Sequence, residues 1–428
     1  MARNMKDSGI EWIGEIPDGW EVLAHKYIMH KEKSICEHYS GEDVISLTLN
    51  GVVKRDLENP SGKMPTTFDG YQFVDPNDLL LCLFDIDVTP RCVGLVKDYG
   101  VTSPAYSRFK IHSGFCNAFY NYLLRFIDDE KVFVHLSKNL RSSLTESDFG
   151  AIKTIVPPKA EQQRIADYLD NRTFEIDTLS SKVRSSIEEY KKLKQAVITQ
   201  AVTKGVRGER EMKDSGVEWI GEIPKEWSVS PMKHFIDILP GYAFSSDDFC
   251  IEEGIPLLRG INVGVNEIRW DETVRWNHSI SKQLESFFLK ENDLVVGLDR
   301  PWISDGTRVA FIAKKDLPCL LLQRVCRIRT RCNFDIRWIY YWLSGSSFKD
   351  SLSTETTGIS VPHISTKQIE QFIVAFPNLL EQTQVCNYLD AKCAEIDKLI
   401  AKKKQLIIEL ESYKKSLIYE VVTGKREV

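Results

Sequence analysis

The sequence predicts a mixed α/β (α+β) protein in which two globular domains are separated by two long antiparallel coiled-coil helices. Three observations carry this prediction: a motif that occurs twice, a long amphipathic pattern after each of two inserts, and strand and helix patterns mixed within the inserts. The chain has 428 residues, which is too long for one ordinary core. The doubling also predicts a pseudo-twofold repeat.

Two blocks of the sequence are repeated. Residues 5–22 and 212–229 match at fourteen of eighteen positions, at an offset of 207. Residues 161–203 match several positions of residues 381–423, at an offset of 220. The inserts between these blocks, roughly 23–157 and 230–377, look largely unrelated. The chain is therefore one frame that holds two different inserts, whereas a duplicated enzyme would repeat the inserts, where its catalytic groups would lie.

Each insert is followed by a long helix pattern. The first begins after Pro157 and Pro158, has apolar residues at a three–four spacing from Ile176 to Val197, and ends near Gly205. At 1.5 Å per residue, such a helix is roughly 65 Å long. The second copies it and ends at Gly424. Equal amphipathic helices favour a coiled coil, although core helices of a larger bundle are the alternative, and Ser186 and Lys403 depart from ideal heptads.

The inserts read as mixed α/β domains. Strands are expected at residues 43–49, 79–84, 92–97, 255–259, 293–297, 309–312 and 320–328, and helices at 117–127 and 335–343. Both inserts have a strand, a polar loop (85–91 or 298–305) and a further strand, and the loop residues differ completely. We divide the chain into a first domain at 1–157, a spacer helix at 158–205, a second domain at 206–377 and a second spacer helix at 378–428.

Motifs of several enzyme classes are absent from the sequence. There is no phosphate-binding loop, no glycine-rich dinucleotide fingerprint and no His-Glu-x-x-His zinc motif. Asn59 and Pro60 begin a turn rather than a methyltransferase motif. Asp85 and Asp87 could hold a metal, but a solvated loop is the simpler interpretation. The ten cysteines lack zinc-ligand spacing and are expected to be reduced, mostly buried thiols.

Charge and hydropathy restrict the environment and the partners. The net charge of −5 argues against a protein that coats nucleic acid by bulk charge, but it allows local basic patches. No apolar run approaches the ~20 residues that span a bilayer, and the N-terminus has no signal-peptide pattern. A cytoplasmic protein is expected.

The repeated motifs resemble those of the specificity subunits of type I restriction–modification systems. The resemblance lies in the opening from Asp7 to Pro17 with Trp20, in the block that begins Glu161-Gln162, and in a long helix ending at Gly205. Residues 241–246 and 254–259 of the second insert also look like segments of that family. The chain departs from its own first copy at residues 383, 384 and 386, which could alter a partner contact.

The resemblance implies a non-catalytic DNA reader. Each insert would be a target-recognition domain that reads one half of a split, asymmetric DNA site. The helix pair would act as a ruler that docks the modification subunits, two of them by the family pattern. Those partners would bind S-adenosylmethionine and methylate a flipped adenine, and restriction subunits would use ATP and magnesium to cut DNA. No cofactor or metal is expected in this chain.

Direct readout of bases needs donors and acceptors on loops that face the groove. The candidate DNA-binding residues are Arg91, Lys97, Tyr106 and Arg108 in the first insert and Tyr242, Ser245, Arg259, Asn262, Arg300, Trp302 and Arg308 in the second. Candidate phosphate contacts are Lys54, Arg55, Lys314 and Lys315. Solvated charge or core packing is the alternative for each of these residues.

Three other functions stay open from the sequence. The same reader could serve a fused restriction or phage-defence enzyme, the chain could be a nuclease of unrecognised fold, or it could be a coiled-coil scaffold without a DNA function. Neighbouring genes, metal-dependent cleavage by the isolated chain, and DNA binding by a partner would discriminate these alternatives.

Overall fold

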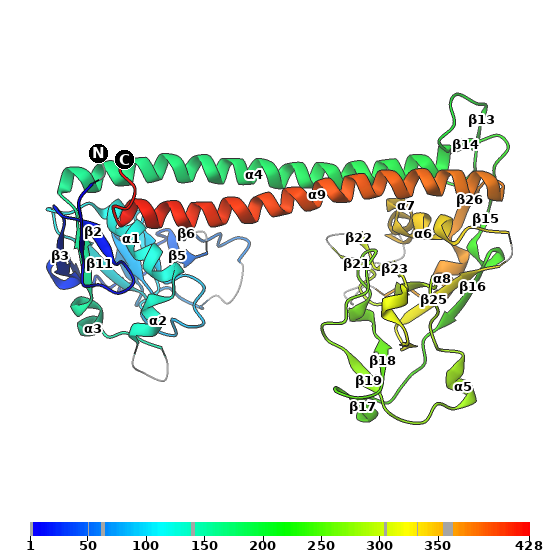
Figure 1. Cartoon of the computed structure of the whole chain (residues 1–428), viewed down its shortest axis with the longest axis horizontal. Helices are drawn as coiled ribbons and strands as arrows, with labels where there is room; N and C mark the ends of the chain where they lie inside the picture. The colour runs from blue at the N-terminus through cyan, green and yellow to red at the C-terminus, as the bar shows by residue number, and fades with distance from the viewer. Residues whose placement is uncertain are drawn as a thin grey trace. The chain divides into compact units, whose positions relative to one another are not determined.

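The computed structural model describes residues 3–49, 51–60, 65–137, 142–303, 306–331, 333–353 and 363–428. Contacts divide the chain into two compact units, residues 1–183 with 405–428 and residues 184–404. Each unit contains one insert and one part of each long helix (Figure 1). Ser61 and Gly62, Cys332, and the loop residues Ser304 and Asp305 lie outside the described residues.

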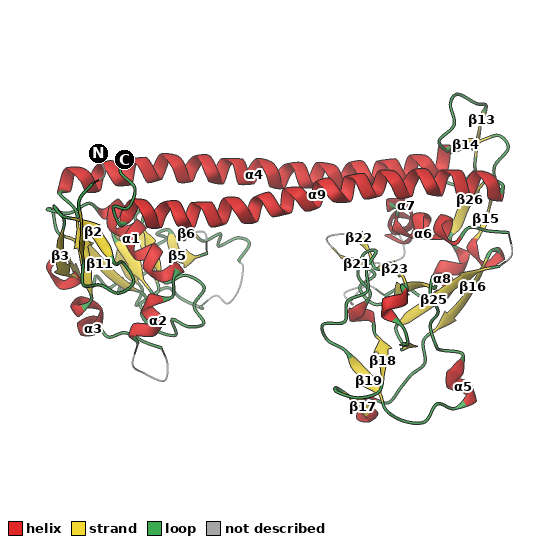
Figure 2. Ribbon diagram, viewed as in Figure 1, coloured by secondary structure: helices red, strands yellow, loops and turns green. Residues whose placement is uncertain are grey.

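The first unit combines strands with short helices (Figure 2). Its strands are β1 (Met5–Asp7), β2 (Glu15–Pro17), β3 (Glu21–Ala24), β4 (Met29–Lys31), β5 (Val44–Thr48), β6 (Gly51–Lys54), β7 (Gln72–Val74), β8 (Leu79–Leu81), β9 (Val93–Leu95), β10 (Gly100–Thr102), β11 (Ser107–Ile111) and β12 (Lys153–Val156). Its helices are α1 (Asn117–Asp129), α2 (Val132–Leu136) and α3 (Glu146–Ala151), followed by the start of α4 (Lys159–Lys204).

The second unit has a comparable set of elements. Its strands are β13 (Met212–Asp214), β14 (Glu222–Pro224), β15 (Ser228–Pro231), β16 (Ile236–Pro240), β17 (Phe249–Cys250), β18 (Ile255–Leu258), β19 (Val274–Trp276), β20 (Leu294–Gly297), β21 (Trp302–Ile303), β22 (Gly306–Thr307), β23 (Val309–Phe311), β24 (Leu320–Leu321), β25 (Val325–Thr330) and β26 (Ile373–Phe376). Its helices are α5 (Lys282–Glu285), α6 (Ile336–Ser344), α7 (Ser346–Ser353) and α8 (Thr366–Gln371), followed by the start of α9 (Leu379–Val422).

The frame closes each insert at its base. The strands at the two ends of an insert pair with each other: β3 with β12, and β15 with β26. Beside them, the repeated motif folds into an antiparallel hairpin, β1–β2 or β13–β14. Its tryptophan, Trp20 or Trp227, is completely buried in the core of its unit. The matching sequences therefore build matching bases for two different inserts.

The repeated Glu-Gln pair fastens the insert to the long helix. The Gln162 side chain accepts a hydrogen bond from the Cys116 amide (2.8 Å) at the start of α1, and it donates to the carbonyl of Pro157 (2.8 Å). Gln382 makes the equivalent bonds at 3.0 and 2.9 Å to the amide of Asp335 and the carbonyl of Pro377. A glutamine can serve both bonds because its amide carries an acceptor and two donors.

A second repeated contact joins the frame motif to its helix. Arg3 pairs with Glu161 at 2.6 Å and lies over the ring of Trp20, with the guanidinium carbon 5.7 Å from the centroid. In the second unit, Arg210 pairs with Glu381 at 2.7 Å and lies 5.3 Å from the ring centroid of the equivalent tryptophan. Ion pairing and cation–π attraction act on the same guanidinium in both copies.

The two inserts share their main sheet, although their sequences look unrelated. The strand order is β4-β11-β8-β9 in the first insert and β16-β25-β20-β23 in the second. A second sheet in each insert contains one parallel pair, β5 with β10 or β18 with β24. Helices α1 and α6 follow at corresponding places. The shared order of strand, loop and strand that the sequence indicated is therefore part of a common fold, on which the loop residues differ.

Most expected elements are present, and one is wrong. Strands β5, β8, β9, β18, β20 and β23 and helices α1 and α6 lie within or close to their expected ranges. The single strand expected at residues 320–328 is instead two strands, β24 and β25, which belong to different sheets. The chain turns between them at Arg324, which has a positive φ of 68°. The largely apolar run at residues 320–328 therefore gave no sign that the chain passes from one sheet to the other.

The long helices run antiparallel to each other within each unit. In the second unit, Lys194 of α4 pairs with Asp397 of α9 at 2.7 Å, while Lys403 lies over the ring of Tyr190. The first unit contains the repeat-equivalent ion pair, between Lys414 and Asp177, at 2.6 Å. The cation–π contact explains why a lysine occupies a position where a heptad would place an apolar residue.

The apolar stripes of the helices pack chiefly where they meet an insert. In the first unit, Leu169 from the start of α4 and Val421 from the end of α9 join one core. In the second unit, Ile198 from the end of α4 and Leu389 from the start of α9 join one core. Several residues of the expected stripes remain exposed: Leu179, Leu193, Leu406 and Tyr413. No described helix combines the length and apolarity that crossing a bilayer requires.

Candidate nucleic-acid interface

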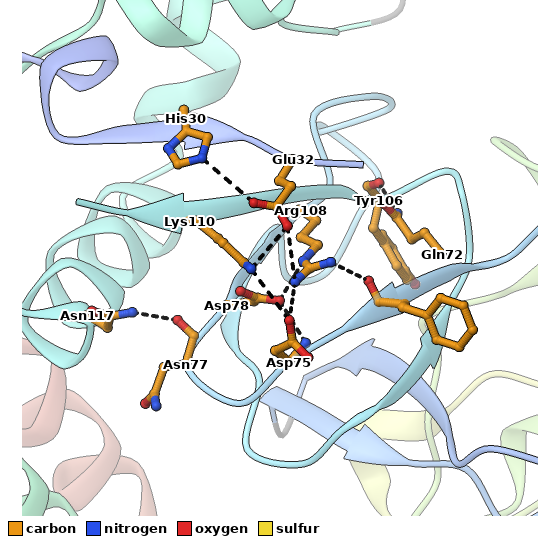
Figure 3. Close-up of polar contacts among 11 residues, drawn as sticks. His30, Glu32, Gln72, Asp75, Asn77, Asp78, Tyr106, Arg108, Lys110 and Asn117 are labelled. Carbon is orange, nitrogen blue, oxygen red and sulfur yellow. Dashed lines mark hydrogen bonds and ion pairs between the residues drawn. The ribbon is translucent and has the colours of Figure 1, made fainter. Parts of the chain in front are cut away.

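Arg108 does not lie on the surface of the first insert. It is 2% exposed in β11, and its Nε donates to Asp78 at 2.5 Å (Figure 3). Its two Nη atoms donate to Asp75 at 2.6 Å and to the carbonyl of Phe73 at 2.9 Å. The pKa of Asp78 is raised, chiefly because burial disfavours the carboxylate, and the Arg108 charge opposes this. The prediction that Arg108 contacts DNA is therefore corrected: it holds the sheet together.

The second insert has an equivalent buried carboxylate. Asp293 precedes β20 as Asp78 precedes β8, and both side chains accept a hydrogen bond from the backbone amide three residues earlier, at 2.7 Å. Its ionic partner is Arg329, on β25, at 2.7 Å. The arginine–aspartate pair is thus a structural feature of both inserts rather than a reading element.

The other candidates in the first insert are accessible to different degrees. Arg91 is half-buried: its Nε donates to the carbonyl of Leu49 at 3.1 Å, and its Nη2 pairs with Asp129 at 3.5 Å. Lys97 is exposed. Tyr106 lines a shallow polar depression of about 350 Å³ together with Lys54 and Arg55 and several residues of the β5–β6 hairpin. Burial raises the pKa of Tyr106, so its hydroxyl stays a donor.

Two candidates in the second insert are engaged by their own fold. Asn262 is 2% exposed, accepts from the amide of Arg259 at 3.0 Å and donates to the carbonyl of Arg269 at 2.8 Å. Arg308 donates to the backbone carbonyls of Val263 (2.8 Å) and Gly260. The structure removes Asn262 from the DNA-contact candidates because its amide is buried and hydrogen-bonded within the insert. The guanidinium of Arg308 donates to backbone carbonyls and so holds the neighbouring loops in place.

The remaining candidates of the second insert lie at its surface. Tyr242 packs in an aromatic cluster with Phe244, whereas Ser245 is exposed. Arg259 is half-buried, and Trp302 packs against Phe348. Arg300 is exposed and has a positive φ of 45°. Both candidate phosphate contacts of this insert, Lys314 and Lys315, are exposed on one short turn.

Sequence reasoning missed a polar cluster beside the loop that carries Arg300. Asp299 pairs with Arg324 at 2.6 Å and with His363 at 2.6 Å, and these residues come from three separate parts of the second insert. No local pattern signals the cluster, because each residue is isolated in the sequence. The cluster fixes the loop that carries Arg300, so it positions a surface without having to contact a ligand itself.

Potential metal ligands are dispersed and most cysteines are buried among the described residues. No three side chains among histidine, cysteine, aspartate and glutamate come together as a metal site within the described ranges. The nine described cysteines are free, and all but Cys250 are buried. Burial raises the pKa of Cys319 to about 12, which keeps this thiol protonated and unreactive. The arrangement suits binding by loops and local charges.

Comparison with known proteins points to one family. Residues 224–412 match the model of the type I restriction modification DNA specificity domain. The type I restriction enzyme MjaVIII specificity subunit of Methanocaldococcus jannaschii is 31% identical over 281 residues, which is 65% of this chain and 63% of that protein. The EcoAI specificity subunit of Escherichia coli is 33% identical over 193 residues, 44% of this chain and 32% of that protein. The chain thus covers less than two thirds of either relative.

Solved structures share the fold along the chain. The HsdS subunit from Thermoanaerobacter tengcongensis aligns with a TM-score of 0.51 and 16% identity over 96% of this chain and 98% of its own. A chain from a study of complex assembly and conformational transition of the type I R-M system aligns with a TM-score of 0.71 and 14% identity, over 96% of this chain and 99% of its own. At these identities, the likeness concerns the fold alone.

Proposed function

We propose that the chain belongs to the DNA-specificity family of type I restriction–modification enzymes and is the subunit that reads a bipartite, asymmetric DNA site for such an enzyme. Each insert reads one half-site. The chain has no catalytic step of its own and positions partner subunits on the DNA. The partners are modification subunits, which methylate adenine at N6, and restriction subunits, which translocate and cleave DNA.

One observation carries the proposal: the same frame and the same sheet order are used twice, while the loops at corresponding places carry different side chains. A scaffold protein would have no need for two distinct polar loop sets on a shared fold. Side chains on rigidly supported loops are the usual carriers of recognition. Two different loop sets support two different half-sites.

The division of labour follows from charge and chemistry. A chain with a net charge of −5 makes few phosphate contacts by bulk attraction, so partners that add cationic surface would supply much of the affinity. S-adenosylmethionine, ATP and magnesium belong to those partners in this proposal. Exposed apolar residues on the long helices, including Leu193 and Tyr413, offer contact area for them.

Genome-wide mapping of methyladenine tests the proposal. Cells that carry the modification subunit are compared with and without this chain, and expression of the partner is verified in both. We expect a methylated motif of two short defined blocks with an undefined gap of constant length, present only with the chain. If an active partner produced no chain-dependent methylation, the proposed function would be wrong, and cleavage by the isolated chain with a divalent metal would be assayed next.

A further inference from the structure

The two inserts carry an equivalent loop after an equivalent strand. Strands β8 and β20 occupy the same place in sheets of the same order, and each is followed by a loop that returns to the neighbouring strand, β9 or β23. An equivalent hydrogen bond anchors each loop: Leu144 N donates to the carbonyl of Leu83 at 2.8 Å, and Ile364 N donates to that of Leu298 at 2.9 Å. Both donors lie shortly before a capped helix, α3 or α8.

The same backbone conformation occurs two residues beyond each anchor. Asp85 has a φ of 47° and Arg300 a φ of 45°, both in the left-handed region. Where these sheets need that conformation simply to enter the strand, both inserts use asparagine, Asn77 and Asn292, which tolerates it well. Arginine does not favour it, and strained residues of this kind cluster at functional sites. Aspartate tolerates this conformation as asparagine does, so the strain lies at Arg300, where we attribute it to the side chain that the position presents.

Both side chains are free to meet a ligand. The backbone carbonyl of Asp85 accepts from Thr89 Oγ1 at 2.8 Å, so the turn is held through the main chain. The loop around Arg300 is held by neighbours, since Asp299 pairs with Arg324. Asp85 and Arg300 are exposed, and neither the carboxylate nor the guanidinium has a bonding partner among the described residues.

We propose that Asp85 and Arg300 are the equivalent base-reading residues of the two inserts. This inference rests on the proposed function and adds the chemistry of one position in each half-site. In the major groove, an aspartate accepts from the amino group of cytosine, and an arginine donates to O6 and N7 of guanine. The same loop position thus selects a base that donates in one half-site and a base that accepts in the other.

Methylation rates on substituted DNA test this assignment. The full chain, assembled with its modification subunit, methylates duplexes that contain the mapped site with each defined position changed in turn. For the unmodified chain, we expect about ten- to hundredfold discrimination at one cytosine of one block and at one guanine of the other. Asp85→Asn should abolish the first preference, shift it toward adenine and leave the other block unchanged, because asparagine pairs with adenine.

Arg300→Asn should abolish the guanine preference in the other block only. Asparagine tolerates the left-handed conformation, so both variants keep the loop. The matched controls are Asp87→Asn, in the same loop as Asp85, and Arg331→Asn, an exposed arginine just after β25; both should leave every ratio within about twofold. Hydrogen exchange of β8 and β20 verifies that the sheets are intact.

The outcomes separate this inference from the function on which it rests. If the unmodified chain directs methylation but both variants keep every discrimination ratio, Asp85 and Arg300 do not read bases. If a variant slows methylation of all substrates equally, its residue contributes general affinity, and the base-reading assignment is again wrong. If the unmodified chain directs no methylation, the proposed function fails first.

Discussion

Replacing Arg108 by methionine should destabilise the first insert rather than alter its DNA preference. The change removes the guanidinium that pairs with Asp78 at 2.5 Å, and the side chains of the two residues are only 2% and 4% exposed. Removing one partner of a buried pair typically costs 3–5 kcal/mol. Asp78 keeps the hydrogen bond from the Asp75 amide, so we expect about 3 kcal/mol, at the lower end of that range.

The loss should depend on pH in a defined direction. Burial already raises the pKa of Asp78, and without the arginine charge it should rise further above its unfolded value. A carboxyl whose folded pKa is raised binds its proton more tightly in the native state, so its stability contribution is lost as pH rises through the folded pKa. The variant should therefore be closer to the unmodified chain at pH 5 than at pH 8.

Hydrogen exchange, corrected for intrinsic rates, measures both effects segment by segment. Protection of β8 and β11 should fall by roughly a hundredfold or more in Arg108→Met, while peptides of the second insert serve as an internal reference. Lys110→Met is the matched control on the same strand, since Lys110 is 34% exposed and pairs with Glu32 at 3.0 Å. It should cost less than about 1 kcal/mol. Equal effects of the two substitutions, or a larger deficit at pH 5, would refute this reasoning.

Three further changes test the frame and the long helices. Gly424→Ala places an alanine at a φ of 73° with its Cβ 2.6 Å from Pro17, so it should destabilise the first unit by more than about 1 kcal/mol. Gly9→Ala is the control for backbone strain alone, because Gly9 has a φ of 64° and open space around it. Hydrogen exchange in β1 and β2 measures the loss of stability in both variants. Glu381→Gln leaves the Arg210 guanidinium without its buried carboxylate and should cost about 1–3 kcal/mol, seen as faster exchange at the start of α9; unchanged exchange would contradict the role of the pair. Four residues inserted into both helices add about 6 Å of rise each, so, if the helices set the spacing, methylation mapping should find the gap wider by about two base pairs with both half-sites kept.

The frame could be predicted from the sequence because its information is repeated. The doubled motif marked Trp20 and Trp227 as equivalent, and both are fully buried in equivalent hairpin bases. The Glu-Gln blocks marked Gln162 and Gln382, which make the same two hydrogen bonds. Long helices follow from periodicity and from proline and glycine at their ends, which are local signals.

The sequence indicated a common local order of strand, loop and strand in the inserts, but it could not predict how the strands pair. Strand pairing is non-local, so two sheets of the same order can be built from different residues. One short signal exists, the Asn-Asp-Leu sequence at residues 77–79 and 292–294, which enters β8 and β20 with the same turn. Its meaning becomes clear only when the registers of the strands are known.

The DNA-contact prediction was wrong where a polar side chain was taken as a sign of exposure, as at Arg108 and Asn262. Arg108 is buried because an acceptor from a distant segment, Asp75, meets it, and Asn262 is buried because its amide closes a local turn onto the carbonyl of Arg269. Spacing along the chain cannot reveal a partner such as that of Arg108, which lies 33 residues away. The contacts of the other candidate residues stay predictions, and Asp85, which the sequence suggested was only solvated, is raised to a candidate by its backbone conformation and its equivalence to Arg300.

Exchange of the inserts tests most directly the claim that one frame presents two independent readers. In the chain to be measured, a second copy of residues 23–157 replaces residues 230–377, so that the first insert occupies both places in the frame. Methyladenine is then mapped genome-wide with the modification subunit present. The account predicts a motif made of two copies of the half-site read by the first insert, with no trace of the other block. A motif that keeps the second block after its insert has been removed would contradict the account, because specificity would then lie in the frame or in the partners.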